Sequence, residues 1–338
     1  MRSTSVMKAG FIAGLTLGVT IASSQIQLAQ QQAPAAAPAA AQAGRGGQRG
    51  PDPRAQQRTH LFAETNEQMP YALYVSSKVT KDKKNPLIVA LHGLSGTQNT
   101  MVGASYGAID LAEQGGYIYL SPMGYNCSGW FGAGAPGGGG ARRGAAGPGA
   151  GASPAAAPQA AAPQGAAPQA GAPQRGTGGR GGGCVGGGTA VTDAAKVREM
   201  SEKETMQVLD LVRKEFNVDE RRIYLFGHSM GGAGTYHLAS KYPNIWAAIG
   251  PVAPAAMGMT NDRVKILQSI KDAGVPVLVS MGDADEVVPV ASVRTWVDTM
   301  KELQMNYEYK EYPGITHGPI IGASMADVFK FFDKHSKR

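Results

Sequence analysis

The chain has 338 residues, of which 47 are glycine and two are cysteine, and its formal net charge is +7. Residues 133–188 hold 20 Gly, 17 Ala and 7 Pro, and residues 29–60 are similarly poor in apolar side chains. Neither segment can bury enough apolar surface to offset the entropy of ordering its backbone, so the length supports one domain of roughly 220 residues instead of two. Residues 1–60 and 133–188 carry net charges of +5 and +4, which leaves −2 for the rest and argues against a basic fold that binds nucleic acid.

The first 24 residues have the pattern of a signal peptide. Two basic residues, Arg2 and Lys8, precede a 14-residue apolar stretch at 9–22, which is too short to span a bilayer comfortably. Small residues allow cleavage before Gln25, and cleavage after Ala29 is the alternative. We expect residues 25–60 to form a disordered linker. The mature chain is expected to be periplasmic or extracellular, with no stable membrane insertion.

Hydrophobic patterning predicts a single domain over 61–338, interrupted by the insert at 133–188. Short continuous apolar runs are typical of strands buried in a parallel sheet, and apolar residues three or four apart are typical of helices. Strands are predicted at 69–75, 86–91, 117–121, 222–226, 247–252, 277–281 and 307–312, and helices at 100–114, 199–216, from 231 onward, 262–272, 292–303 and 324–335. This alternation predicts an α/β fold with a mostly parallel central sheet, helices on both faces, no large cap domain and one long disordered insert.

The two cysteines, Cys127 and Cys184, flank the insert. Two cysteines in an exported chain suggest one disulfide, and two free thiols are the alternative. A bridge between them would close a long loop and contribute about 4 kcal/mol by restricting the unfolded chain.

The sequence Gly-His-Ser-Met-Gly at 227–231 follows a predicted strand and precedes a predicted helix. In this context the pattern G-x-S-x-G forms a sharp turn that presents the serine hydroxyl. Bulky residues at 227 and 231 would collide there, and the helix N-terminus favours negative charge that develops at the serine. The sequence therefore predicts that Ser229 is a nucleophile.

A serine nucleophile needs a histidine base that an acid orients, and in this fold class the acid and then the histidine follow the serine. His317 is the expected base, because it lies in a loop after the last predicted strand. Asp285 is the favoured acid, since it follows the strand at 277–281, and Asp283 and Glu286 are the alternatives. The other histidines are expected to lie in the linker (His60), before the serine (His92, His228), at a packing or surface position (His237) and in the exposed C-terminal run (His335).

The loop Leu-His-Gly-Leu-Ser-Gly at 91–96 follows another predicted strand. Its backbone can donate a hydrogen bond to a tetrahedral oxyanion, together with the residue after the nucleophile. Leu94 and Met230 are the expected donors and Gly93 is the fallback, while His92 is expected to shape the loop.

An aromatic wall near the serine is predicted from Tyr125, Trp130 and Phe131, at the first junction of the insert. Tyr125, Trp130 and His228 are the candidate substrate-binding residues. The alternative for Trp130 is packing beside the expected disulfide.

These motifs resemble those of α/β-hydrolases. More narrowly, the chain resembles secreted esterases of the polyhydroxybutyrate-depolymerase and feruloyl-esterase type, and the catalytic domain of prolyl-oligopeptidase-family hydrolases. The resemblance covers about 61–131 and 189–338, and it rests on Leu-His-Gly-Leu at 91–94, Gly-His-Ser-Met-Gly-Gly at 227–232, Gly-x-x-Asp-x-x-Val-Pro at 282–289 and His-Gly at 317–318. The chain departs from the pattern in its insert, which falls at the rim of the expected cleft, and in having no room for a propeller domain before the first predicted strand.

We therefore expect an enzyme that hydrolyses carboxylic esters through an acyl-serine intermediate, with no cofactor and no metal. The expected partner is an ester-bearing small molecule or polymer, and the protein is expected to be a monomer. The first alternative is hydrolysis of peptides or amides by the same residues. The second is a non-catalytic surface-binding protein on a hydrolase scaffold.

Overall fold

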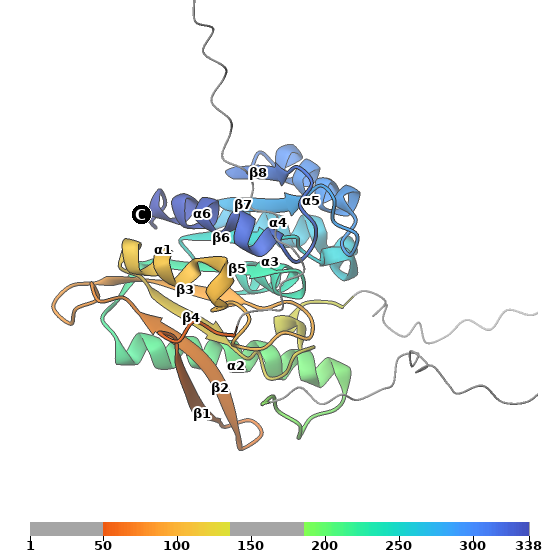
Figure 1. Cartoon of the computed structure of the whole chain (residues 1–338). Coiled ribbons are helices and arrows are strands. Elements are labelled where there is room, and N and C mark those ends of the chain that lie inside the picture. Colours follow the sequence, from red (N-terminus) through yellow and green to blue (C-terminus); the bar gives the residue numbers. More distant parts are fainter. Residues whose placement is uncertain (1–49, 136–185, 338) are drawn as a thin grey trace, which may run out of the picture. The chain divides into compact units, whose positions relative to one another are not determined.

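The structure, a computed structural model, describes residues 50–135 and 186–337, all of which belong to one compact unit (Figure 1). The predicted signal peptide, Cys184 and most of the predicted linker and insert lie outside the described residues.

The centre of this unit is an eight-stranded sheet with the strand order β1-β2-β4-β3-β5-β6-β7-β8. The first two strands run antiparallel, β2 also pairs antiparallel with β4, and all other neighbours are parallel. The strands are β1 (Gln56–Phe62), β2 (Glu67–Val75), β3 (Asn85–Leu91), β4 (Ile118–Pro122), β5 (Val218–His228), β6 (Ala248–Val252), β7 (Val277–Gly282) and β8 (Tyr307–Tyr312). Every residue of β3, β4, β6 and β7 is buried, which explains their continuous apolar sequences.

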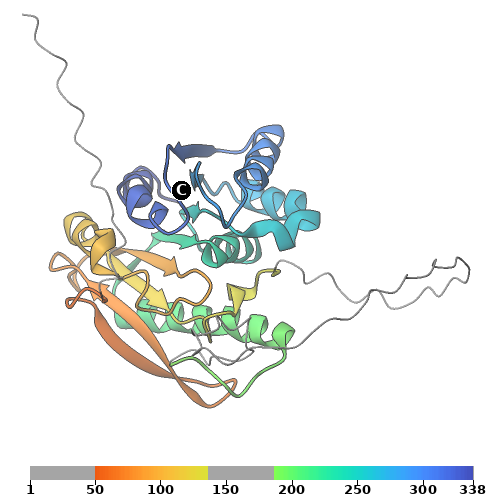
Figure 2. The same cartoon turned by 45° about the vertical axis from the view of Figure 1, so that its right-hand side comes forward.

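Helices cover both faces of the sheet, as predicted (Figure 2). The helices are α1 (Ala108–Gly115), α2 (Ala194–Glu215), α3 (Met230–Lys241), α4 (Arg263–Asp272), α5 (Val290–Glu302) and α6 (Ile320–Asp333). One layer contains α1 and α6, which contact each other, and the other contains α2 to α5. The stacked rings of Tyr236 and Trp296 join α3 to α5 in that second layer. Within the described residues, each helix is too short or too polar to cross a membrane.

The prediction of a disordered linker up to residue 60 is wrong at its end, because β1 begins at Gln56. The sequence does not predict this strand, because its exposed residues other than Leu61 are polar and one of its two buried side chains is a histidine. His60 is buried and lies 3.0 Å from the Glu204 carboxylate on α2, a partner that the local sequence does not reveal.

Two further predicted boundaries also change. The predicted helix at 100–114 is a short 3₁₀ turn at Ala104–Tyr106 followed by α1, because Gly107 between them has a left-handed φ of 71°. The insert is ordered at its two ends. Ala133 is buried there, and Gly188 N–H donates to the Tyr125 carbonyl.

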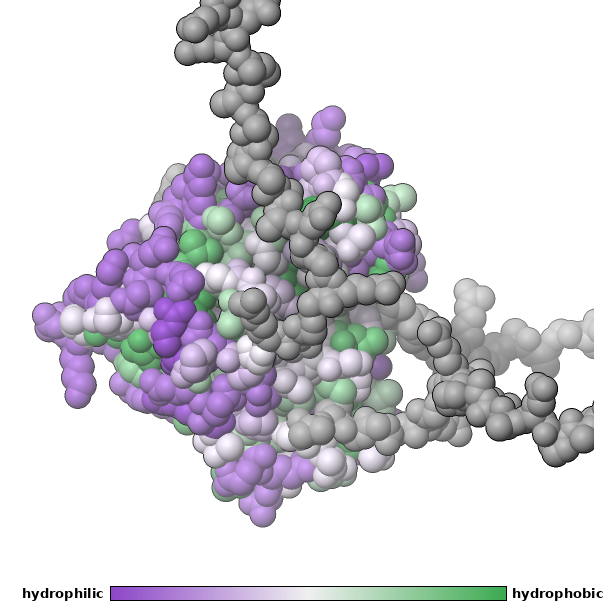
Figure 3. All heavy atoms as spheres, in the orientation of Figure 1, coloured by the Kyte–Doolittle hydropathy of each residue, from purple (hydrophilic) through white to green (hydrophobic). Residues whose placement is uncertain are grey.

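Hydrophilic side chains predominate over much of the face seen in Figure 3, with smaller hydrophobic areas between them. Among the described residues, the exposed large apolar side chains are Leu61, Leu94, Val264 and Val287. Leu94 and Val287 both line the cleft described next, and exposed apolar groups at a cleft are typical of a binding site.

Candidate active site

Ser229 occupies a sharp turn between β5 and α3, at the edge where the parallel strands end. Its backbone angles, φ 56° and ψ −113°, lie outside the regions that a residue with a side chain favours. The Ser229 N–H donates to the Val252 carbonyl at 2.9 Å, and the Ser229 carbonyl accepts from Ala255 N–H at 2.9 Å. The end of β6 therefore holds the serine in a strained conformation of the kind found at functional sites.

The two glycines that flank this turn are sterically required, as predicted. A Cβ at Gly227 would lie 2.4 Å from the Gly231 oxygen, and a Cβ at Gly231 would lie 2.3 Å from the Leu91 oxygen. Leu91 and Gly227 are register partners in β3 and β5, so the turn packs directly against the end of the neighbouring strand.

Replacing Gly231 with alanine should therefore destabilise the fold. We expect Gly231→Ala to lower the free energy of unfolding by about 3 kcal/mol, because the methyl group meets backbone that cannot rotate away. Gly318→Ala is the control, since a Cβ there meets nothing within 4 Å. Urea unfolding measures both, and equal losses in the two variants would contradict this explanation.

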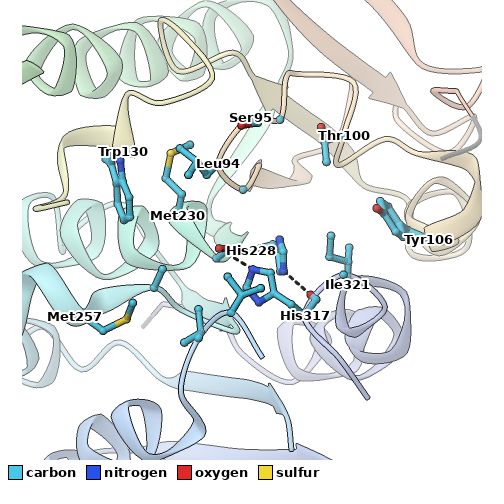
Figure 4. A pocket seen from close by; sticks show the side chains of 17 residues that line it. Leu94, Ser95, Thr100, Tyr106, Trp130, His228, Met230, Met257, His317 and Ile321 are labelled. Atoms are coloured by element: carbon cyan, nitrogen blue, oxygen red, sulfur yellow. Dashed lines mark hydrogen bonds between the residues drawn. The ribbon is translucent and has the colours of Figure 1, made fainter. Parts of the chain in front are cut away.

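Ser229, His317 and Asp285 form one chain of hydrogen bonds. His317 Nε2 lies 2.9 Å from Ser229 Oγ (Figure 4). On the other side of the ring, His317 Nδ1 lies 2.7 Å from Asp285 Oδ2. An ionised carboxylate only accepts hydrogen bonds, so Nδ1 carries the proton and Nε2 accepts from the serine hydroxyl. The Asp285 side chain is fully buried, while that of His317 is 18% exposed.

Asp285 and Asp283, which both follow β7, have different surroundings. Asp285 Oδ1 accepts from the backbone N–H groups of Val287 and Val288 at 2.8 and 2.9 Å, which leaves Oδ2 for His317. Asp283 Oδ1 instead accepts from Gly314 N–H at 2.6 Å and joins the loops after β7 and β8. The geometry thus pairs His317 with Asp285, and Asp283 braces the loop.

The loop after β3 presents a backbone N–H next to the serine. The Gly93 carbonyl accepts from Gly96 N–H at 2.9 Å and lies 2.8 Å from His92 Nδ1. Because the carbonyl and the following N–H of one peptide point in opposite directions, these contacts turn the Leu94 N–H away from the loop interior. Within the described part of the chain, the N–H groups of Leu94 and Met230 have no hydrogen-bond acceptor, and both residues line the cleft.

His228 lies beside His317, with ring centroids 4.5 Å apart, and its Nε2 donates to the His317 carbonyl at 2.8 Å. It lines the cleft but is only 7% exposed, so it supports the loop that carries His317. Burial, and then the proximity of His317, lower the pKa of His228 from 6.5 to about 4. His228 is therefore neutral at pH 7.

This lowered pKa predicts a loss of stability in acid. Below pH 6.5 the unfolded chain binds a proton at His228 that the folded chain excludes down to about pH 4, so stability falls as the pH falls through this window. Between pH 7.5 and 4.5 the native chain should lose about 2–3 kcal/mol more than His228→Gln, which keeps a donor for the His317 carbonyl but does not titrate. Urea unfolding at the two pH values measures the effect. Equal losses of stability in the native chain and in His228→Gln would contradict the prediction.

The remaining histidines lie away from Ser229 or inside the loops. His92 is fully buried and contacts the Gly93 and Met123 carbonyls, which agrees with a role in shaping the loop. His237 lies 2.7 Å from Glu202. His335 is half-buried against Phe331, where the sequence predicted an exposed residue.

A cleft of about 550 Å³ opens above the serine and histidine. Trp130 lines it and has a φ of 57°. Phe131 follows with a φ of 49°, but it is fully buried and does not line the cleft. The Phe131 N–H donates to Ser201 Oγ at 3.0 Å, which anchors this strained pair to α2. Tyr106 and Met257 also line the cleft, and the sequence does not predict them because neither belongs to a recognisable motif.

Tyr125 is not a cleft residue, and its prediction as a substrate-binding side chain is wrong. It is fully buried in a second apolar cluster, where it packs against Phe62. Its hydroxyl donates to Glu67 at 2.9 Å and accepts from Val191 N–H at 2.9 Å. Tyr125 instead fixes the returning end of the insert to β2, a long-range contact that the sequence does not show.

Cys127 lies in the loop between β4 and the insert, where its carbonyl accepts from Ser95 N–H at 2.8 Å. This bond joins the insert junction to the loop of Leu94. Cys184 lies outside the described residues, so the pairing of the two cysteines stays a prediction.

Comparisons with known proteins agree with this geometry. Residues 185–321 match the dienelactone hydrolase family. A bifunctional acetylxylan esterase/xylanase of Neocallimastix patriciarum is 29% identical over 120 residues, which are 32% of this chain and 16% of that protein. The cutinase est1 of Thermobifida alba is 31% identical over 128 residues, which are 36% of this chain and 40% of the cutinase. The matched region is thus less than half the length of these relatives.

A solved ferulic acid esterase from Anaeromyces mucronatus, in complex with ferulic acid, superposes with a TM-score of 0.55 and 15% identity. The alignment covers 86% of this chain and 93% of that esterase. At this identity the likeness concerns the fold alone. Together with the strand order and the serine turn, it shows that the chain has an α/β-hydrolase fold, within which residues 185–321 match the dienelactone hydrolase family.

Proposed function

We propose that this chain is an exported serine esterase, which hydrolyses carboxylic esters through an acyl-serine intermediate. The observation that carries the proposal is the hydrogen-bonded chain from Ser229 through His317 to buried Asp285, at the floor of an open cleft. A serine, an imidazole and a carboxylate at these distances are the components that a weakly nucleophilic hydroxyl needs for attack.

In the first half of the reaction, Ser229 Oγ attacks the ester carbonyl carbon while His317 Nε2 takes the hydroxyl proton. Asp285 stabilises the imidazolium that forms. The tetrahedral intermediate then collapses, and His317 gives the proton to the departing alcohol. In the second half, His317 deprotonates a water molecule that attacks the acyl-serine, which releases the acid and restores the hydroxyl.

The N–H groups of Leu94 and Met230 are the proposed donors to the oxyanion. Neither N–H group has an acceptor in the described part of the chain, so a ligand oxygen can accept hydrogen bonds from both without displacing another partner. His92 and Gly96 hold the Gly93 carbonyl, and this fixes the direction of the Leu94 N–H before substrate binds. Donors oriented in advance stabilise the developing charge without the cost of reorganisation.

An ester is favoured over an amide because the named relatives are an acetylxylan esterase and a cutinase. An open cleft with exposed Leu94 and Val287 at its rim suits an ester on a larger molecule or polymer as well as a small ester. Export, inferred from the predicted signal peptide, agrees with substrates too large to enter a cell.

Hydrolysis of a matched ester and amide tests the proposal. We expect the purified chain to hydrolyse p-nitrophenyl butyrate and to hydrolyse butyryl p-nitroanilide at least a thousand times more slowly, measured as kcat/KM. Exclusive cleavage of the anilide would refute the esterase proposal and favour a peptidase. Hydrolysis of neither compound, nor of other esters, would favour a binding protein.

A further inference from the structure

The strand β8 forms one edge of the described sheet. It pairs in parallel with β7 on one side, and within the described residues no strand pairs with its other side. Figures 1 and 2 show no described helix or strand beyond it. The helices α5 and α6 contact β7, one strand further in, so they lie over the faces of the sheet and not along its edge.

Alternate residues of β8 point their backbone groups away from β7. The carbonyls of Asn306 and Tyr312, at the two ends of the strand, accept from β7 and from the loop that follows it, at 3.1 and 3.2 Å. Because backbone directions alternate along a strand and this register is unbroken, the even-numbered residues bond to β7. The N–H and carbonyl groups of Tyr307, Tyr309 and Glu311 therefore point outward, and they have no partner within the described residues.

A row of unpaired backbone groups on an exposed strand is a template for pairing with another strand. Antiparallel pairing satisfies both the N–H and the carbonyl of each outward residue. A second copy of β8 satisfies all of them at once if Tyr309 lies opposite the partner's Tyr309. Tyr307 then lies opposite the partner's Glu311, and Glu311 lies opposite the partner's Tyr307.

The charges of β8 favour this register over its neighbours. Glu308 and Lys310 are exposed on the face that α6 covers, where they lie 3.6 Å from Lys334 and 2.5 Å from Asp327. With Tyr309 at the centre, Glu308 lies opposite the partner's Lys310 on the same face, and the two-fold axis repeats this pair. The smallest shift that keeps the outward groups paired is two residues. It places either the two Glu308 or the two Lys310 side chains opposite each other, which is unfavourable.

We propose that β8 pairs antiparallel with β8 of a second copy, so that two eight-stranded sheets join about a two-fold axis at Tyr309. On the face that α5 covers, the two Tyr309 rings meet at the axis, and each hydroxyl donates to Glu311, which Arg294 also contacts. The sequence predicts a monomer, and this inference departs from that prediction. The dimer should be weak, with a Kd of about 10 µM, because one strand pair buries less surface than a standard interface.

Sedimentation of the full chain tests the inference. We expect the native chain to pass from monomer to dimer between about 1 and 100 µM. Glu308→Lys and Lys310→Glu should each dimerise at least about tenfold more weakly, because like charges then face each other at both ends of the pair. Lys265→Glu makes the same charge change as Lys310→Glu at an exposed position on α4, and this control should dimerise like the native chain.

A mixture of the two single variants tests the register itself. Across the axis, Glu308→Lys meets Lys310→Glu with opposite charges at both ends, so the mixture should form a heterodimer as strong as the native dimer. A native chain that stays monomeric at about 100 µM would overturn the inference. So would a dimer that is equally strong in both single variants, or a mixture that associates no better than its components. None of these measurements depends on the esterase activity, so the proposed function is tested separately.

Discussion

Ser229→Ala should lower kcat for p-nitrophenyl butyrate by about a million-fold, because it removes the atom that forms the acyl bond. The His317 imidazole and the N–H groups of Leu94 and Met230 remain in place, so a slow reaction of water in the cleft should persist above the uncatalysed rate. Steady-state kinetics with a sensitive product assay measure the effect.

The fold should not change in this variant. The Ser229 hydroxyl is bonded only to His317 in the described residues, and the backbone bonds to Val252 and Ala255 do not need it. We expect the midpoint of thermal unfolding to stay within about 2 °C of the native value. A folded variant that keeps more than a hundredth of the native kcat would show that another group is the nucleophile.

Asp285→Asn should lower kcat by about ten-thousand-fold. Asparagine has nearly the same shape, but its amide can donate to His317 Nδ1 and so favours the tautomer that carries its proton on Nε2. That tautomer cannot accept the proton of Ser229.

Asp283→Asn is the matched control, two residues away on the same loop. Asp283 contacts Gly314 N–H, so its amide variant should lose less than about tenfold in kcat through a loosened loop. If the two variants had the reverse effects, Asp283 would be the acid that orients His317 during turnover.

The buried parallel strands could be predicted because their sequences leave few alternatives. β3 and β7 are short apolar runs, buried along their whole length, and each lies between turn residues. The turn at Ser229 could also be predicted, because only glycine fits at positions 227 and 231. Backbone atoms close in space leave no room for a Cβ at either position.

The edge of the sheet could not be predicted in the same way. β1 depends on His60, which is buried by pairing with Glu204 on a helix that follows 144 positions later. Tyr125 depends similarly on Glu67 and Val191. Polar side chains of this kind look exposed in a sequence, and only tertiary contact makes them part of the interior.

The loops around the site include features that could be predicted from the sequence and features that could not. The order of serine, acid and histidine predicts which loops meet, and the structure brings those loops together. Tyr106 gives no such signal, because it belongs to a connection in which Gly107 ends the 3₁₀ turn and α1 begins later than predicted. The chemistry was therefore easier to predict than the shape of the cleft.

Covalent labelling tests the central claim most directly. A fluorophosphonate should react with the native chain at one site, and peptide mass mapping should place the phosphonyl group on Ser229. His317→Ala should slow this labelling by at least a thousand-fold, because the hydroxyl loses its base. Rapid labelling of a different serine, or no labelling of a folded and catalytically active protein, would contradict the account.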